Sequence, residues 1–322
     1  MGLQMNRTRW LLSSALVWFA STCIADSAII RKPFTVKEIL LKVERGCIAG
    51  ADRILLVGIP KGDFKNPQES MTLYCMDRDG RLLWQQKAGG FSDLLVIDSA
   101  VCVAGFHDGS FYTRSYALSG GIELDSALVP YTAKGTTTLK MLGARRAVVA
   151  TSQGENLTQF LLLDMSSSQQ KIQAAGRVNG YVDFAHGVSF KGDTVVFGYM
   201  LFDPIEQAKG NKPSSFFSCG IRGNAFTRTD RIVGPEQTTS RQFWDVVVNG
   251  QSVYFQSAYR ATQSKMLESD LMCVPLLGSI STQTKNLMVV NGKRKFLDIR
   301  GHEALFADGQ NIEIVSIALA KK

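Results

Sequence analysis

The feature that most constrains the fold of this chain is a recurring group of four short apolar runs separated by tight turns. After residue 25 the runs are rich in Val, Ile, Leu, Phe and Tyr, and helical periodicity is nearly absent. Turn pairs such as Asp79-Gly80, Asp108-Gly109 and Asn249-Gly250 stand between them. Gly, Asn and Asp tolerate the positive φ angles of tight hairpins. The pattern therefore predicts antiparallel strands joined by hairpins along most of the chain.

The strands recur in groups of four, with the first group expected at 37–44, 53–59, 71–77 and 81–87. The next groups are expected at 92–98, 100–106, 110–118 and 122–129; 136–142, 146–151, 159–165 and 171–178; 181–190, 194–202, 215–221 and 225–233; and 242–248, 252–259, 270–277 and 281–290. A period of roughly 40–55 residues with four strands per unit is typical of β-propeller blades.

The sixth group offers only three strands, at 294–300, 303–307 and 311–319. The β-prone segment 28–36 can supply the missing outer strand, and a closed ring leaves fewer exposed sheet edges. We therefore predict an all-β, six-bladed β-propeller over residues 26–322, with four-stranded antiparallel blades and an N-terminal strand completing the last blade. Two alternatives stay open: seven blades, if 181–240 divides differently, and a pair of open β-sandwiches.

The first 25 residues differ from the rest and indicate export. Two arginines precede the short apolar stretch 10–20, and no acidic residue occurs before Asp26. This is the pattern of a secretory signal peptide, with cleavage expected after Ala25, so we expect a periplasmic protein. A lipoprotein with Cys23 lipidated is the alternative. No later stretch is apolar enough for a transmembrane segment, which needs about 18 residues.

Charge and cysteine usage exclude some classes of partner and site. The formal net charge is +8, but the basic residues are scattered, so nucleic acid is not an expected partner. Five cysteines follow residue 25, without any CxxC pair, so a zinc site is not expected. Their odd number leaves at least one thiol unpaired, and the disulfide pairing stays open. We expect cysteines in apolar runs to be buried as small hydrophobic residues.

The segment 75–84 resembles the repeat of quinoprotein-like propellers. An apolar strand ends in Asp77, a turn follows at Gly80, and the next strand closes on Trp84. The resemblance implies a propeller in which Trp84 packs between neighbouring sheets. Enzymes of that family bind pyrroloquinoline quinone with calcium. The sequence shows no matching cluster of acidic, amide and aromatic residues, so no cofactor is predicted.

No known catalytic motif occurs in the chain, and no catalytic residue or metal site is predicted. The three histidines, His107, His186 and His302, lie far apart, and each is expected at an exposed or satisfied position. Four aspartates on the expected innermost strands are candidates for the central channel: Asp93, Asp183, Asp245 and Asp298. Whether they converge stays open, and the alternative is that each is a solvated or hydrogen-bonded strand residue.

Long connections are the more informative signal for function. With the strands of a blade lettered A to D from the axis outward, the A–B and C–D turns share one face, and the B–C and D–A connections share the other. The long stretches 60–70, 203–214 and 260–269 are all expected to be B–C connections. Long loops are costly to order and are often functional. The predicted binding residues are Lys61, Asp63, Phe64, Lys65, Asp203, Glu206, Lys209, Lys212, Arg260 and Lys265.

The sequence thus predicts a non-enzymatic periplasmic propeller that binds another protein through this loop face. An envelope scaffold and a toxin-immunity protein both fit this description. The alternative is a small-ligand-binding or hydrolytic propeller enzyme, quinoprotein-like or lactonase-like, that uses the central channel.

Overall fold

The structure is a computed structural model, which describes residues 29–30, 33–36, 39–62, 66, 69–131, 137–152, 157–166, 171–202, 214–233, 241–260, 267–276, 285–290 and 294–317. Every regular element in these ranges is a β-strand. Within the same ranges there is no helix with the length and apolar character needed to cross a bilayer.

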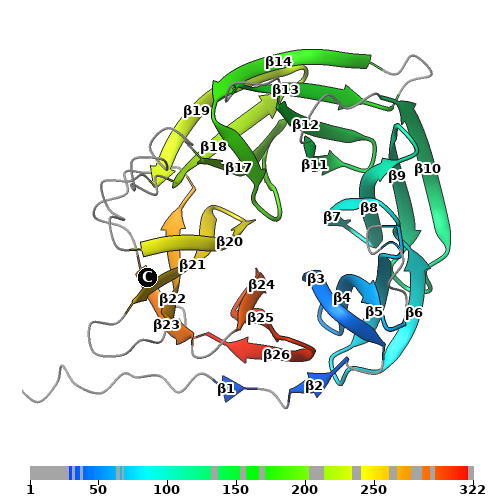
Figure 1. The fold of residues 1–322 in the computed structure, drawn as a ribbon, viewed down its shortest axis with the longest axis vertical. Coiled ribbons are helices and arrows are strands. Elements are labelled where there is room, and N and C mark those ends of the chain that lie inside the picture. Colours follow the sequence, from blue (N-terminus) through cyan, green and yellow to red (C-terminus); the bar gives the residue numbers. More distant parts are fainter. Residues whose placement is uncertain are drawn as a thin grey trace, which may run out of the picture.

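The strands form six antiparallel sheets arranged as blades around a central axis (Figure 1). Blade 1 consists of β3 (Leu40–Ala49), β4 (Arg53–Pro60), β5 (Thr72–Asp77) and β6 (Leu82–Lys87). Blade 2 consists of β7 (Phe91–Ile97), β8 (Ala100–His107), β9 (Ser110–Ala117) and β10 (Glu123–Pro130). Blade 3 consists of β11 (Thr137–Gly143), β12 (Arg146–Ser152), β13 (Leu157–Asp164) and β14 (Lys171–Asn179).

Blades 4 to 6 complete the ring. Blade 4 consists of β15 (Tyr181–Phe184), β16 (Ser189–Lys191), β17 (Thr194–Phe202), β18 (Ser214–Arg222) and β19 (Ala225–Val233). Blade 5 consists of β20 (Arg241–Asn249), β21 (Ser252–Arg260), β22 (Leu267–Pro275) and β23 (Lys285–Val290). Blade 6 contains β24 (Lys295–Arg300), β25 (Glu303–Asp308) and β26 (Asn311–Ser316).

The N-terminal segment closes the last blade, as the sequence predicts. Strands β1 (Ile29–Ile30) and β2 (Phe34–Thr35) both pair antiparallel with β26, where they take the place of the fourth, outer strand of blade 6. The six-bladed propeller with four-stranded blades is therefore confirmed, and the seven-bladed and sandwich alternatives are excluded. Closure by the opposite end of the chain removes the free edge that β26 would otherwise present.

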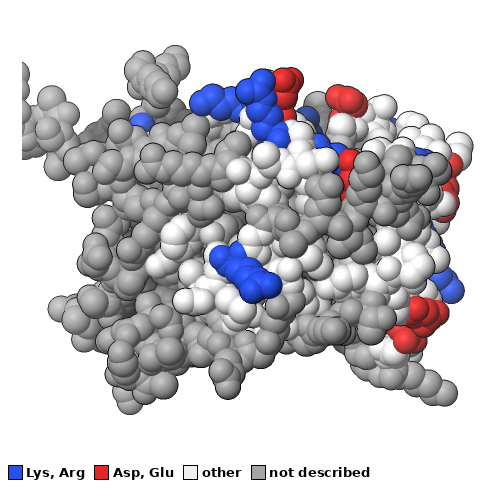
Figure 2. All heavy atoms as spheres, turned by 90° about the horizontal axis from the view of Figure 1, so that it is seen from above, with Lys and Arg blue, Asp and Glu red and all other residues white. Residues whose placement is uncertain are grey.

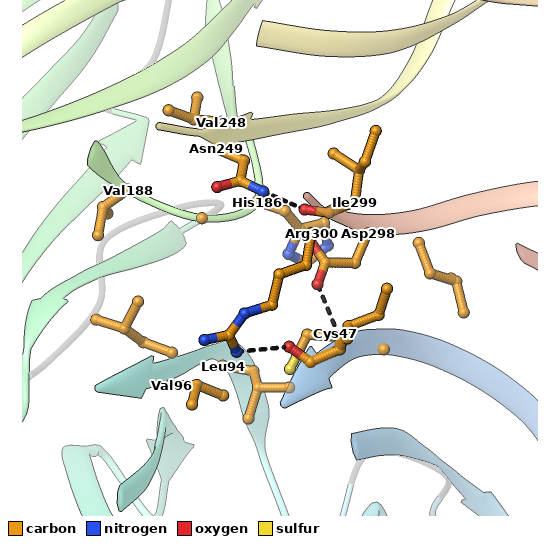
Figure 3. A pocket seen from close by; sticks show the side chains of 15 residues that line it. Cys47, Leu94, Val96, His186, Val188, Val248, Asn249, Asp298, Ile299 and Arg300 are labelled. Carbon is orange, nitrogen blue, oxygen red and sulfur yellow. Dashed lines mark hydrogen bonds between the residues drawn. The ribbon is translucent and has the colours of Figure 1, made fainter. Parts of the chain in front are cut away.

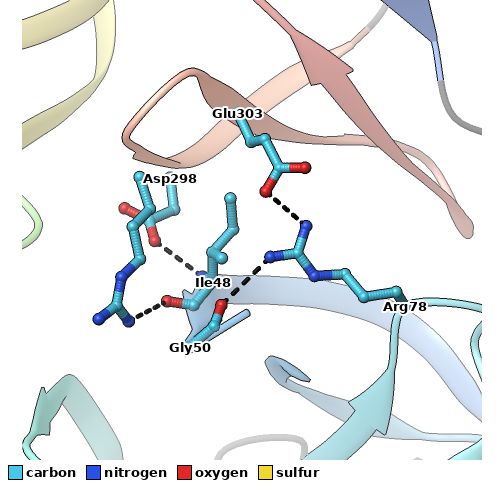
Figure 4. A network of polar contacts seen from close by, with 6 residues as sticks. Ile48, Gly50, Arg78, Asp298 and Glu303 are labelled. Carbon is cyan, nitrogen blue, oxygen red and sulfur yellow. Dashed lines mark hydrogen bonds and ion pairs between the residues drawn. The ribbon is translucent and has the colours of Figure 1, made fainter. Parts of the chain in front are cut away.

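Apolar packing and one ion pair hold the seam between blades 6 and 1. Leu56 and Leu305, from these two blades, belong to one buried cluster, against which Phe34 packs. Arg78, in the turn between β5 and β6, places Nη1 2.6 Å from Glu303 Oε2 and donates from Nη2 to the Gly50 carbonyl at 3.1 Å (Figure 4). The turn that follows Asp77 therefore takes part in ring closure.

The tryptophan of the quinoprotein-like segment contacts the other neighbouring blade. Trp84 Nε1 donates to the Leu118 carbonyl at 3.0 Å, and Gln86 Nε2 donates to the Gly121 carbonyl at 2.8 Å. A Cβ on Gly121 would lie 2.7 Å from the Trp84 ring, so only glycine allows this approach. Trp84 thus packs between blades 1 and 2, and the segment 75–84 contributes to both seams of blade 1.

Some strand bounds differ from the expected ones. Strand β3 runs on to Ala49, beyond the expected end at 44, and the expected strand 181–190 is split into β15 and β16. The C–D connection of blade 5 spans 276–284, so the face with the shorter turns also carries one long connection. Alternating patterns locate strands, but they do not show where a strand is interrupted or extended by pairing with a neighbour.

No disulfide joins the five described cysteines to one another, and three of them, Cys75, Cys102 and Cys219, are buried. Cys47 on β3 and Cys75 on β5 are each paired in register with Leu55 of the strand between them. Two strand spacings of about 4.8 Å separate their backbones, which is too far for a disulfide.

Candidate functional site

The innermost strands of the six blades face a central axis, and all four candidate aspartates lie on them (Figure 1). Asp93 lies on β7, Asp183 on β15, Asp245 on β20 and Asp298 on β24. The strand assignment of these residues was therefore correct. Their environments divide them into two pairs.

Asp93 joins two neighbouring blades. Its carboxylate accepts a hydrogen bond from the Met141 backbone N at 2.7 Å and lies 3.1 Å from Lys140 Nζ, both on β11. Lys140 is 0% exposed and Asp93 4%. Burial lowers the pKa of Lys140, while the Asp93 charge opposes that shift. This is a buried ion pair between blades 2 and 3.

Asp298 has the same role at the closing seam. Its Oδ2 accepts a hydrogen bond from the Ile48 backbone N at 2.8 Å, which ties β24 of blade 6 to β3 of blade 1 (Figure 4). Burial raises the pKa of Asp298 to about 7, although backbone hydrogen bonds from Ile48 and Ile299 favour the carboxylate. Asp93 and Asp298 therefore match the alternative of hydrogen-bonded strand residues.

Asp183 and Asp245 belong to a charged group in the channel. Asp183 is exposed and Asp245 half-buried. Desolvation inside the ring raises the pKa of both, whereas the charges of Arg45 and Lys295 lower it. Asp245 also has a positive φ of 49°, at an irregularity in the pairing of β20 with β21. A bulge of this kind redirects a side chain out of the regular alternation. The four residues come from blades 1, 4, 5 and 6, and the charges of the two cations act on the pKa of the two aspartates.

The sequence reading missed the cations and a pattern shared by the aspartates. Arg45, Lys140 and Lys295 lie on the inner strands β3, β11 and β24, and Lys140 stands as a single charge within an apolar run. Each of the four aspartates stands two residues after an aromatic residue: Phe91, Tyr181, Phe243 and Phe296. This aromatic-x-Asp spacing was the signal that could have identified them as equivalent strand positions.

His186 enters the channel because the inner strand of blade 4 is interrupted. Its backbone N donates to the Val246 carbonyl at 2.7 Å, and its carbonyl accepts from the Val248 N at 2.7 Å, so this segment pairs with blade 5. Gly187 has a φ of 69°, and a Cβ there would lie 2.3 Å from the Val248 carbonyl oxygen. His186 is half-buried and lies in no hairpin turn, because its segment pairs with blade 5 instead of continuing the inner strand of blade 4.

A cavity of about 240 Å³ opens beside His186 (Figure 3). Its polar lining residues are Cys47, His186, Asn249, Asp298 and Arg300. The lining strand segments 46–48, 94–96, 248–249 and 297–300 all lie just before A–B turns. The pocket is therefore at the A–B mouth of the channel, on the face opposite the B–C connections.

Burial keeps two of these side chains uncharged at neutral pH. It lowers the pKa of His186 well below its ordinary value, and the cations Arg45, Lys140 and Lys295 lower it further. Burial raises the pKa of the Cys47 thiol well above its ordinary value, and the nearby Asp298 carboxylate adds to the effect. A protonated thiol is a poor nucleophile, so Cys47 lacks the activation that covalent catalysis requires.

The predicted loop face is only partly described. Lys61 is exposed directly after β4, and Arg260 is the last residue of β21. The other predicted binding residues lie outside the described residues: Asp63, Phe64, Lys65, Asp203, Glu206, Lys209, Lys212 and Lys265. Their part in binding stays a prediction.

The described residues contain no group of three or more His, Cys, Asp and Glu side chains placed to hold a metal ion. His107 is exposed at the tip of the β8–β9 hairpin, 3.1 Å from Asp108, and His302 lies in the turn before β25.

Comparisons with known proteins found only solved structures of low sequence identity. No family model matches the chain, and no curated protein matches it. The Dos1 propeller is 11% identical, with 90% of this chain and 95% of that chain covered and a TM-score of 0.48. The β-propeller domain of the Trilobed protease from Pyrococcus furiosus is 10% identical, with 93% and 96% covered and a TM-score of 0.49.

A variant of Synechocystis apocarotenoid oxygenase is 10% identical, with 79% of this chain and 64% of that chain covered and a TM-score of 0.47. These scores add nothing to the fold assignment, which follows from the strand pairing itself. The chain is a β-propeller, and its resemblance to quinoprotein-like propellers is not supported by any family match.

Proposed function

We propose that this chain is a non-enzymatic periplasmic β-propeller that binds another protein through the face carrying its B–C connections. One observation carries the proposal: the A–B turns at 50–52, 98–99, 144–145, 192–193, 250–251 and 301–302 are all short, whereas the B–C connections include 61–71 and 203–213. Turns that only join strands can be short, and longer loops are usually retained for binding.

The two longest B–C connections belong to blades 1 and 4, which lie opposite each other in the ring (Figure 1). A partner seated over that mouth of the channel can contact both connections at once. Lys61 and Lys209 supply one positive charge on each of them. An envelope scaffold and an immunity protein both need such a surface, and the identity of the partner separates these roles.

The first experiment retrieves a partner from a periplasmic extract with residues 26–322 and then measures its affinity as a purified protein. We expect Lys61→Glu and Lys209→Glu each to weaken binding, and the double variant to weaken it ~10-fold or more, since reversed charges at an interface act on association. The matched control is Arg81→Glu with Lys191→Glu, which makes the same charge change on exposed residues of the opposite face. Equal affinities for the two double variants, with unchanged circular dichroism, would rule out the loop face.

A further inference from the structure

The pocket at the A–B mouth has the properties of a preformed site for a small molecule. Its lining comes from β3, β7, the segment 186–188, β20 and β24, which belong to five different blades. Closure of the ring fixes these segments relative to one another, so the pocket needs no rearrangement to exist. Its volume of about 240 Å³ corresponds to about eight water molecules at ~30 Å³ each. The pocket therefore has room for a small organic or inorganic molecule.

Arg300 provides hydrogen-bond donors in this pocket. Figure 3 shows its side chain reaching across the pocket from β24 towards β3, where Nη1 donates to the Ile48 carbonyl at 3.2 Å. A guanidinium carries five N–H donors in a planar fork that matches carboxylate and phosphate oxygens. The contact with Ile48 holds one edge of the fork in place and leaves further donors for a ligand.

His186 provides the second group. Both of its backbone hydrogen bonds go to blade 5, which fixes the residue at the pocket, but none of the described residues makes a hydrogen bond to its imidazole ring. A ring nitrogen that lines a pocket without a protein partner can donate to a ligand. Gly187 is required next to it, because a side chain there would collide with the Val248 carbonyl.

The charge in the pocket lining that favours an anion is the guanidinium of Arg300, which forms no ion pair among the described residues. The charges of Arg45, Lys140 and Lys295, on β3, β11 and β24, lower the pKa of the imidazole and are themselves balanced by nearby carboxylates. Of the acidic groups in the channel, Asp93 is paired with Lys140, and Asp298 accepts the Ile48 backbone N–H. Asp183 and Asp245 are coupled to Arg45 and Lys295. Cys47 is the remaining titratable group in the lining, and it is a neutral thiol.

We propose that this pocket binds a small oxyanion, a carboxylate or a phosphate group, between Arg300 and His186. The site is independent of the protein partner proposed above, because it lies on the other face of the ring. An anion beside the imidazole favours its protonated form, so binding takes up a proton and is tighter at pH 6 than at pH 8.

The test is isothermal titration calorimetry with sodium sulfate, which stands in for a phosphate dianion, and sodium acetate, at pH 6 and pH 8 and constant ionic strength. Choline chloride serves as a cation of similar size. We expect one or both oxyanions to bind, with the preference between them identifying a tetrahedral or a planar ligand group. Arg300→Gln should weaken binding ~10-fold, and Arg300→Lys, which keeps the charge, should recover part of it.

His186→Gln should reduce the pH dependence of oxyanion binding to the part that comes from Asp298. Asp298→Asn should remove that remaining part. The matched control is His302→Gln, in the A–B turn at the same mouth, which should leave both affinity and pH dependence unchanged. The chain has only three histidines, so the His186 ring resonance can also be assigned and followed by NMR. Its apparent pKa should rise on addition of the bound anion, while the other two resonances do not respond.

Three results overturn the proposal: neither oxyanion binds, choline binds as well as they do, or binding is the same in folded Arg300→Gln and His186→Gln variants. Circular dichroism and melting temperature establish whether each variant is folded. Loss of the partner protein in the loop-face variants has no bearing on any of these outcomes.

Discussion

At the scale of single residues, a glycine is indispensable where the backbone of another strand approaches it too closely for a Cβ atom. Gly90 and Gly109 have nearly the same φ, 70° and 71°. A Cβ on Gly90 would lie 1.7 Å from the Phe106 carbonyl oxygen, whereas a Cβ on Gly109 would meet nothing within 4 Å. The two positions therefore separate the effect of left-handed backbone from that of a collision.

We expect Gly109→Ala to lower the free energy of unfolding by about 1–2 kcal/mol, the usual cost of a left-handed L-residue. Gly90→Ala carries the same cost and must also displace the backbone at Phe106, so it should be at least twice as destabilising. Urea denaturation of the two variants measures the difference. Equal losses would show that the backbone around Gly90 relaxes freely.

The pKa of Asp298 predicts a pH dependence of stability. The folded chain keeps this proton up to about pH 7, whereas the carboxyl of the unfolded chain loses it near its ordinary value of 3.8. Between these values the folded state binds more protons, so this residue's contribution to stability falls as the pH rises. Asp298→Asn removes the contribution, and its melting temperature should fall less than that of the wild type between pH 5 and pH 8.

The exposed carboxyl Asp308, at the end of β25, provides the control: Asp308→Asn should keep the wild-type pH profile. If the melting temperature of Asp298→Asn fell as steeply with pH as that of the wild type, Asp298 would not be the source of the pH dependence.

At the scale of elements, buried polar contacts between inner strands hold neighbouring blades together. The Asp93–Lys140 pair joins β7 to β11, and the hydrogen bond from Ile48 to Asp298 joins β3 to β24. Both contacts lie near the axis, where strands of adjacent blades come closest. Apolar packing is non-directional, whereas a hydrogen bond to one particular backbone N–H fixes the position of one inner strand along the next.

We expect Asp93→Leu to cost about 3–5 kcal/mol, because it leaves a buried ammonium unpaired. The double variant Asp93→Leu with Lys140→Met should recover much of that loss, since neither charge remains in the core. Chemical denaturation of the single and double variants tests this expectation. A double variant as unstable as the single one would show that the Met141 backbone contact, not the charge, carries the stability.

At the scale of the whole molecule, stability depends on closing the ring between the two ends of the chain. Strands β1 and β2 pair with β26, Phe34 packs on the cluster shared by blades 6 and 1, and Arg78 binds Glu303 across the same seam. A Cβ on Gly80 would lie 2.4 Å from the Phe34 ring, so the N-terminal segment also lies against the β5–β6 turn. The seam is the one junction of the ring that requires both ends of the chain.

Phe34→Ala should lower the free energy of unfolding by about 1–2 kcal/mol, as expected for a half-buried aromatic ring. Its hydrogen exchange should rise in β26 and β3 and stay unchanged in blade 3, because the seam opens locally. The control is Phe190→Ala, whose side chain is 56% exposed on β16 and which should have almost no effect. Uniformly faster exchange in all blades would contradict local opening.

The sequence by itself determined the six blades, nearly all strand positions and the N-terminal closure. These follow from local alternation and turn residues, and Asp77, Gly80 and Trp84 occupy the positions that the repeat predicts. The sequence also placed the four aspartates on innermost strands.

Only the tertiary structure decided what those aspartates do and where a pocket lies. Asp298 meets Ile48 across 250 positions of sequence, and His186 lines the channel because its segment pairs with Val246 and Val248 of another blade. No local pattern encodes such contacts, since each arises only when the ring has closed and strands from different blades meet at the axis. The burial and protonation of the channel residues are set by that closure.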